Sequence, residues 1–128
     1  MDKDLNKIHT LMRQLFGLVH RLEDEAIKAS EFSDLSRAEI SAIMAIGTGR
    51  PKTMTHVANI LEINVSTLTT TINKLVKKGY VERLRDDKDR RIVKIGLSEK
   101  GVAAATERDS FMGELLRGAV EQVEPDKL

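Results

Sequence analysis

The sequence predicts a mainly α-helical chain that carries one small β-hairpin. Three features lead to this fold class. They are a long amphipathic segment near the N-terminus, a Ser/Thr-rich amphipathic segment over residues 66–78, and two β-prone runs that flank a charged turn. With 128 residues the chain is expected to form one domain. Its expected parts are an N-terminal helix over 1–30, a central region over 33–101 and a C-terminal helix over 102–128.

The first expected helix runs from Lys3 to about Ala29. Its apolar residues alternate spacings of three and four, which makes a heptad seam of about three heptads. The residues of this seam are Leu5, Ile8, Met12, Leu15, Val19, Leu22 and Ala26. A seam of this kind usually packs against a second subunit, so we expect dimerisation here. Packing within the same chain is the alternative, and both can hold at once.

Two shorter helices are expected next. Ser36 and Glu39 match a capping box, which predicts a helix from Arg37 to about Ile46. Its expected inner face consists of Ile40, Ile43, Met44 and Gly47. The chain then breaks at Gly47, Gly49 and Pro51. Thr53 is expected to cap a helix over Met54–Leu61, and the residues expected to point inward are Val57, Ile60 and Leu61.

The Ser/Thr-rich helix begins a few residues later, with Asn64 as its expected N-cap. One face is apolar and consists of Leu68, Ile72, Leu75 and Val76. The opposite face carries Ser66, Thr67, Thr70, Asn73, Lys74 and Lys77. Small hydroxyls, amides and cations contact base edges and phosphates when a helix enters a major groove. Two short helices joined by a tight turn therefore predict a helix-turn-helix, with this second helix as the recognition helix.

A β-hairpin is expected directly after Gly79, which ends the recognition helix. Tyr80–Arg85 and Arg91–Leu97 read as strands, and the tip between them, Asp86–Arg91, is densely charged. Such a hairpin beside a recognition helix is the wing of a winged helix-turn-helix that binds DNA. Ser98 starts the last helix, whose apolar residues are Met112, Leu115, Leu116, Ala119, Val120 and Val123. Gly113 and Gly118 weaken this helix, so it needs packing to persist.

The distribution of charge supports a nucleic-acid partner more than its sum does. The net charge is only +1, but residues 74–100 hold ten Lys and Arg against five Asp and Glu. Affinity for phosphate needs a local basic stripe, because counterions are released only where the surfaces meet. A charge run is by itself more often a solvated face, and the polar recognition helix beside this one favours DNA.

Several other functions find little support. The chain has no cysteine, so disulfides and thiolate metal sites are excluded. It has neither an apolar run of ~18 residues nor a signal peptide, so no membrane partner and a cytoplasmic location are expected. His9, His20 and His56 have no nucleophile motif beside them, so we expect no enzyme activity and no catalytic residue. No cofactor is expected.

Two alternatives stay open. His20 with Glu23 or Asp24 has the helical spacing of two zinc ligands, although such a pair is more often a solvated helix face, and we assign no metal site. A protein-interaction module built on the heptad seam is the other alternative. It would leave the recognition helix and the wing without a purpose.

The sequence resembles the MarR-type (multiple antibiotic resistance regulator) transcription factors over essentially its whole length. The resemblance is most specific in the recognition helix and in four motifs taken in order. These are LSRAE over 35–39, KKGYVER over 77–83, DKDRR over 87–91 and LSEKG over 97–101. It implies a homodimeric repressor on a palindromic operator, with the terminal helices as the dimerisation region. The chain ends at Leu128, where many relatives continue, so we expect part of that region to be short or absent.

The resemblance also assigns roles to residues. It makes Arg91 the arginine that the wing inserts into the minor groove, Asp89 the acid that orients it, and Arg90 a second candidate. The matching positions on the recognition helix are Ser66, Thr67, Thr69, Thr70, Asn73 and Lys74. Lys77, further along, is expected on phosphate. Leu115 and Val120 join the N-terminal seam in the dimerisation region.

Within the family the chain looks most like repressors of bacterial fatty-acid synthesis genes. That resemblance implies an effector: an acyl chain on acyl carrier protein, acting as corepressor in a pocket between the dimerisation helices and the DNA-binding lobe. Three aromatic Phe, one Tyr and no Trp among many aliphatic residues suit an aliphatic ligand. A repressor that responds to drugs or small aromatic compounds, or to zinc, is the alternative.

Overall fold

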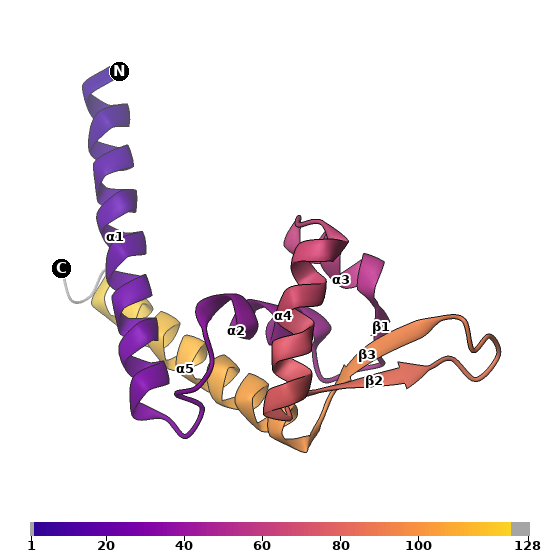
Figure 1. Ribbon diagram of the computed structural model, residues 1–128. Coiled ribbons are helices and arrows are strands. Elements are labelled where there is room, and N and C mark those ends of the chain that lie inside the picture. Colours follow the sequence, from indigo (N-terminus) through magenta and orange to yellow (C-terminus); the bar gives the residue numbers. More distant parts are fainter. Residues whose placement is uncertain (1, 124–128) are drawn as a thin grey trace. The chain divides into compact units, whose positions relative to one another are not determined.

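The computed structural model describes the backbone of residues 2–123 and the side chains up to Gly118. This part of the chain forms five helices and a three-stranded sheet (Figure 1). The elements are α1 (Asp2–Ala29), α2 (Arg37–Ile46), β1 (Lys52–Thr53), α3 (Met54–Leu61), α4 (Val65–Lys78), β2 (Val81–Arg85), β3 (Val93–Leu97) and α5 (Glu99–Val123). The chain divides into two compact units, residues 1–35 and 36–128. The prediction of a mainly helical chain with a β-hairpin is confirmed.

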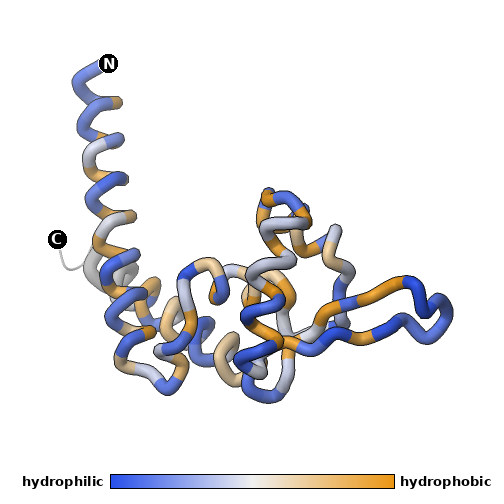
Figure 2. Tube along the Cα trace, viewed as in Figure 1, coloured by the Kyte–Doolittle hydropathy of each residue, from blue (hydrophilic) through white to orange (hydrophobic). Residues whose placement is uncertain are grey.

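The first unit is one helix and the turn that follows it. Apolar residues recur along α1 in Figure 2, as the heptad spacing predicts. None of the helix residues is buried, and most of the large apolar ones are about half exposed. Ser30 ends the helix, because its Oγ donates to the carbonyl of Ile27 at 2.9 Å and accepts from the amide of Phe32 at 3.1 Å.

Helix α2 lies at the centre of the second unit and packs against α3, α4 and α5. The predicted capping box is present, with the Glu39 amide 3.2 Å from Ser36 Oγ and the Ser36 amide 2.9 Å from Glu39 Oε1. Of the predicted inner face, Ile43 is buried, whereas Ile40, Met44 and Gly47 are only half-buried. The buried residues are Glu39, Ala42, Ile43 and Ile46. A prediction from hydrophobic residues alone could not find this face, because it includes the small Ala42 and the carboxylate of Glu39.

Glu39 is the only charged side chain among the buried residues that the structure describes. Its Oε1 accepts from Lys78 Nζ at 2.8 Å, so it ties the start of α2 to the end of α4, while its buried Oε2 has no partner within the described chain. Burial raises the pKa of this carboxyl, but hydrogen bonds from Lys78 and Ser36 outweigh it, and the pKa lies below its ordinary value.

Helix α3 begins at the predicted cap, where Thr53 Oγ1 accepts from the His56 amide at 3.2 Å. Val57 and Ala58 are buried, whereas Ile60, predicted to point inward, is 49% exposed. A helix of two turns buries only a narrow face against the core, and in α3 this face consists of Val57 and Ala58. The turn to α4 passes through Glu62, whose φ of 57° is unusual for a residue with a side chain.

The sheet has the strand order β1-β3-β2, all antiparallel. The predicted hairpin is present, although its strands begin one and two residues later than predicted. Strand β1 was not predicted, because two residues between Pro51 and a helix carry no strand pattern. It pairs Lys52 with Ile95 of β3. The wing is therefore held on one side by a strand from before the helix-turn-helix.

The start of α5 holds the end of α4. Ser98 Oγ donates to the Gly79 carbonyl at 2.6 Å and caps α5 by accepting from the Gly101 amide at 3.1 Å. A Cβ on Gly101 would lie 2.2 Å from the Tyr80 carbonyl oxygen, so only glycine fits this approach. Lys100 lies over the ring of the buried Tyr80, 4.3 Å from its centroid. The junction of α4, β2 and α5 is consequently closely packed.

Candidate nucleic-acid interface

Helix α4 has the two faces that the sequence predicted. Leu68, Ile72 and Leu75 are fully buried, and the helix starts at Asn64, whose Oδ1 accepts from the Thr67 amide at 2.7 Å. The exposed residues of the opposite face are Ser66, Thr67, Thr70, Asn73, Lys74 and Lys77. Thr69, also predicted at the site, is half-buried. The structure thus brings the predicted polar residues to one solvent-facing surface.

The hydroxyl groups of α4 already donate locally. Thr69 Oγ1 donates to the Val65 carbonyl at 2.8 Å, and Thr70 Oγ1 lies 3.4 Å from that of Ser66. Ser66 Oγ donates to Asn64 Oδ1 at 2.8 Å. With their protons engaged, Thr69 and Thr70 offer a ligand a methyl group and oxygen lone pairs. Such groups suit thymine methyls and the amino groups of adenine or cytosine.

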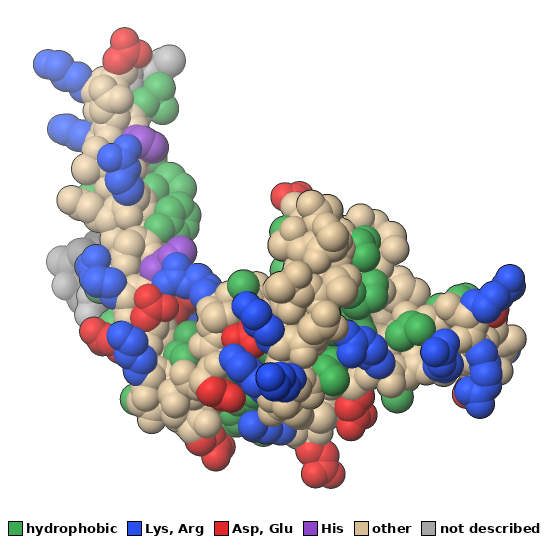
Figure 3. Space-filling view, viewed as in Figure 1, with side chains coloured by type: hydrophobic (Ala, Val, Ile, Leu, Met, Phe, Trp, Pro, Cys, Tyr) green, Lys and Arg blue, Asp and Glu red, His purple; other side chains and the backbone are tan. Residues whose placement is uncertain are grey.

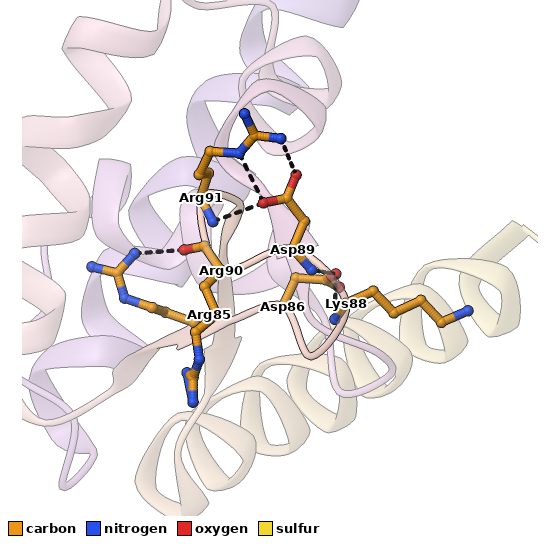
Figure 4. A network of polar contacts seen from close by, with 6 residues as sticks. All are labelled: Arg85, Asp86, Lys88, Asp89, Arg90 and Arg91. Carbon is orange, nitrogen blue, oxygen red and sulfur yellow. Dashed lines mark hydrogen bonds and ion pairs between the residues drawn. The ribbon is translucent and has the colours of Figure 1, made fainter.

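The wing tip is a turn organised by Asp86. Its Oδ2 accepts from the amides of Lys88 at 3.1 Å and Asp89 at 3.0 Å (Figure 4). Its Oδ1 lies 3.2 Å from Lys94 Nζ. The amide hydrogen bond from Asp89 and the contact with Lys94 lower the pKa of the Asp86 carboxyl. The turn therefore has a defined shape although most of its residues are exposed.

Arg91 and Asp89 form an ion pair with two side-chain hydrogen bonds. Asp89 Oδ1 accepts from Arg91 Nε at 3.1 Å, its Oδ2 from a terminal guanidinium nitrogen at 3.0 Å, and the Arg91 amide also donates to it (Figure 4). The pair lowers the pKa of Asp89 and raises that of Arg91. Because the Arg91 side chain is 92% exposed, the carboxylate orients a cation that still faces solvent.

Two further arginines were missed in the sequence. Val81, Arg83 and Arg85 alternate along β2 and so share one face of it, buried at its start and exposed beyond. Arg85 donates to the carbonyl of Arg90 at 2.7 Å, and Arg83 donates to Asn73 on α4. The period-two alternation could have revealed both. The predicted Arg90 is exposed, and its carbonyl supports the tip.

Lys and Arg side chains gather around the lower end of α4 and along the wing in Figure 3. The cations run from Lys77 on α4, through Arg83 and Arg85 on β2, to Arg91 at the tip. This is the local basic stripe that binding to a phosphate backbone requires. The surface pairs it with a helix face of short polar groups, as protein surfaces that contact both phosphates and base edges do.

The residues predicted for dimerisation lie on α1 and α5. Leu5, Ile8, Met12 and Leu15 are 48–56% exposed, and Val19, Leu22 and Leu115 are half-buried. The side chain of Val120 lies outside the described residues. Within the described chain, no three His, Asp or Glu side chains come together as metal ligands would, and no helix combines the length and apolarity that crossing a bilayer needs.

A helix-turn-helix whose second helix is followed by a cationic β-hairpin defines a winged helix-turn-helix protein. The sequence model of the MarR family matches residues 33–92. The chain belongs to the MarR family of transcriptional regulators, as this match and the similarity to the regulator SarZ given below show.

Relatives and solved structures agree with this assignment. The chain is 32% identical over 94 residues to the transcriptional regulator YpoP of Bacillus subtilis, covering 73% of this chain and 64% of the relative. It is 35% identical over 100 residues to SarZ of Staphylococcus saprophyticus, covering 74% and 68%. FabT of Streptococcus pneumoniae, in complex with DNA, superimposes with a TM-score of 0.89 at 28% identity, covering 95% and 85%. The chain spans slightly less than two thirds of YpoP.

Proposed function

We propose that the chain represses transcription by binding a palindromic operator, with the exposed face of α4 in the major groove and Arg91 of the wing in the minor groove. The observation that carries this proposal is the Asp89–Arg91 pair, which presents an oriented and solvated guanidinium at the wing tip. Narrow A·T-rich minor grooves concentrate negative potential and attract an arginine held in this way.

The roles along α4 follow from position. Thr67, Thr70 and Asn73 recur every three residues on the exposed face and have short side chains that meet base edges at close approach. Lys74 and Lys77 lie nearer the end of the helix, where phosphate contact is the expected role. Ser66 and Thr69 flank the base-reading residues and complete the predicted set.

We further propose that the functional unit is a homodimer. The α1 seam exposes four large apolar side chains in a row, Leu5, Ile8, Met12 and Leu15. In its described part, the unit that contains α1 has no second helix or strand to cover them. The heptad spacing of the seam fits the same seam on a second copy. Leu115 and Val120 of α5 are proposed to take part in the dimer interface as well. Two copies would present two recognition helices to a palindrome.

The regulated genes are proposed to be those of fatty-acid synthesis, with an acyl chain on acyl carrier protein as corepressor. The resemblance of the recognition helix and wing to repressors of these genes supports this. Operator binding should strengthen when acyl-loaded carrier protein is added and stay unchanged with the unloaded carrier. A small aromatic compound that releases the operator, with no effect of the acyl carrier, would favour the drug-responsive alternative.

The experiment that tests DNA binding through the wing compares Arg91→Ala with the wild-type chain on an operator selected from random duplexes. If the arginine contacts bases in the groove, the variant should bind more weakly by about 1–3 kcal/mol. If it contacts phosphate, the slope of log affinity against log salt concentration should become shallower by about one. Its melting temperature should not change, since the side chain is solvated.

Arg13→Ala, an exposed arginine of α1, is the control with the same change in net charge. It should bind the operator as the wild type does. Wild-type affinity and salt slope in Arg91→Ala would remove Arg91 from the interface.

A further inference from the structure

Arg83 and Asn73 form a hydrogen bond that joins the wing to the recognition helix. The guanidinium of Arg83 on β2 donates to Oδ1 of Asn73 on α4, and both residues are exposed. The contact closes ten residues of chain, because Gly79 turns the backbone and α4 packs against β2. Asn73 belongs to the predicted base-reading face, whereas Arg83 has so far been described only as one cation of the basic stripe.

The chemistry of the two groups fixes which way the Asn73 amide faces. A guanidinium carries only N–H donors, so it pairs with Oδ1 and never with Nδ2. Without such a partner, an exposed asparagine amide can turn by half a rotation and offer either its oxygen or its amino group. With Arg83 in place, Oδ1 is held toward the wing, and the two hydrogens of Nδ2 face away from Arg83.

The direction of the amide determines what Asn73 can recognise in a major groove. An outward amino group donates to N7 and O6 of guanine, N7 of adenine or O4 of thymine, but it cannot pair with the N4 donor of cytosine. An amide that is free to turn would accept from cytosine as readily as it donates to the other bases. The orientation set by Arg83 therefore discriminates between bases at one operator position.

We propose that Arg83 is a positioning residue for base recognition: it holds the Asn73 amide with its donor outward and so excludes cytosine from the base that Asn73 contacts. This inference rests on the proposed function of α4 as the recognition helix. Through Arg83, the wing thereby influences which base α4 prefers in the major groove. This role is separate from the proposed contact of the wing itself with DNA.

The test is competition binding of the full chain against a panel of single-base variants of the selected operator. In the wild type, cytosine at the Asn73 position should bind worse than the preferred base by roughly 5-fold or more, as one lost base contact costs. In Arg83→Met, the ratio of affinities for the preferred base and for cytosine should fall to about 2-fold or less. The order of preference at the other operator positions should stay the same, because Asn73 contacts only this one base. Arg83→Gln, whose amide both donates and accepts, should also reduce the discrimination against cytosine at this operator position.

Arg85→Met is the matched control. It removes the same charge from the same face of β2, but Arg85 bonds to the Arg90 carbonyl and not to a base-reading side chain. It should lower the affinity of every operator variant by one common factor. In an Asn73→Ala background, Arg83→Met should likewise act as a common factor, because no amide is left to orient.

The outcomes separate this inference from the proposed function. If the wild-type chain selects no duplex and shows no salt dependence, the proposed function fails. If it binds but Arg83→Met lowers all affinities equally, as removal of a phosphate contact would, DNA binding stands and the positioning role is overturned. An unchanged ranking in Arg83→Gln would overturn it as well.

Discussion

Helices α1 and α4 have the same kind of sequence and opposite surroundings. Both place apolar residues at helical spacing along one face. In α4 this face is covered, and Leu68, Ile72 and Leu75 are fully buried by other elements of residues 36–128. In α1, Leu15 is 56% and Ile8 is 53% exposed.

Amphipathicity alone therefore does not identify what packs on the apolar face of a helix. The helix-turn-helix and wing bury the apolar face of α4, so only its polar face is accessible to a ligand. The described part of the α1 unit supplies no such core, so its apolar face is left for a partner. Burial of a leucine or isoleucine side chain contributes about 1.5–3 kcal/mol, which makes an uncovered seam a strong candidate for association.

The largest expected effect comes from breaking the α1 seam. Leu15→Asp combined with Leu22→Asp should abolish the dimer, because each copy would have to bury two unpaired carboxylates at a cost of several kcal/mol each. Sedimentation should then show monomers or unfolded chains where the wild type shows dimers.

The control is Thr10→Asp combined with Gln14→Asp, which adds the same charge to exposed positions of α1 outside the seam. It should remain a dimer. A folded, soluble dimer of the Leu15 and Leu22 double variant would remove the seam from the interface.

A smaller effect is expected where α4 is tied to α2. Glu39→Gln should lower the free energy of unfolding by about 1–3 kcal/mol at neutral pH, since it removes a buried charge-assisted hydrogen bond with Lys78. The pKa of Glu39 is lowered in the folded chain, so its contribution is complete above the ordinary value of 4.5 and is lost as the pH falls through the folded-state pKa.

Urea unfolding should therefore show a gap between wild type and Glu39→Gln that closes in acid. Glu82→Gln, at an exposed glutamate of β2, should show no gap at either pH. A gap for Glu39→Gln that is equally large below pH 4.5 would mean that the ion pair is not its cause.

The smallest effect concerns the turn before α4. Glu62 adopts a left-handed conformation with φ 57° and ψ 41°, which is unfavourable for most residues and accessible to asparagine. Glu62→Asn should raise the free energy of unfolding by about 0.5–1 kcal/mol, measured by urea unfolding. Glu62→Gln removes the same charge but keeps the unfavourable conformation, so it should change little. Equal stabilisation by both variants would assign the effect to charge.

The parts of the fold that depend on neighbouring residues were predictable. The caps at Ser36, Thr53 and Asn64 and the stop at Gly79 act within one turn of backbone, so the sequence displays them directly. The polar face of α4 followed from the same periodicity. The predicted site residues of this face are exposed except for Thr69, and those of the wing tip lie in the turn after β2. Their roles in DNA binding stay predictions.

The parts that depend on distant residues were missed. Strand β1 exists because Lys52 meets Ile95, and Glu39 is buried because Lys78, 39 residues away, compensates its charge. The exposure of Ile60 depends on which stripe of α3 reaches the core. The contact of Arg83 with Asn73 was missed because the two residues lie on different elements. Periodicity gives the faces of each element but not their neighbours.

Helix α4 is proposed to contact bases with the residues of its first turns and phosphates with those near its end. Competition binding of Thr67→Ala, Thr70→Ala and Lys77→Ala against single-base variants of the selected operator tests this proposal. The threonine variants should change which operator variants bind best, and Lys77→Ala should weaken all of them about equally. If the threonine variants lower every affinity by one common factor, or change none, α4 is not the recognition helix described here.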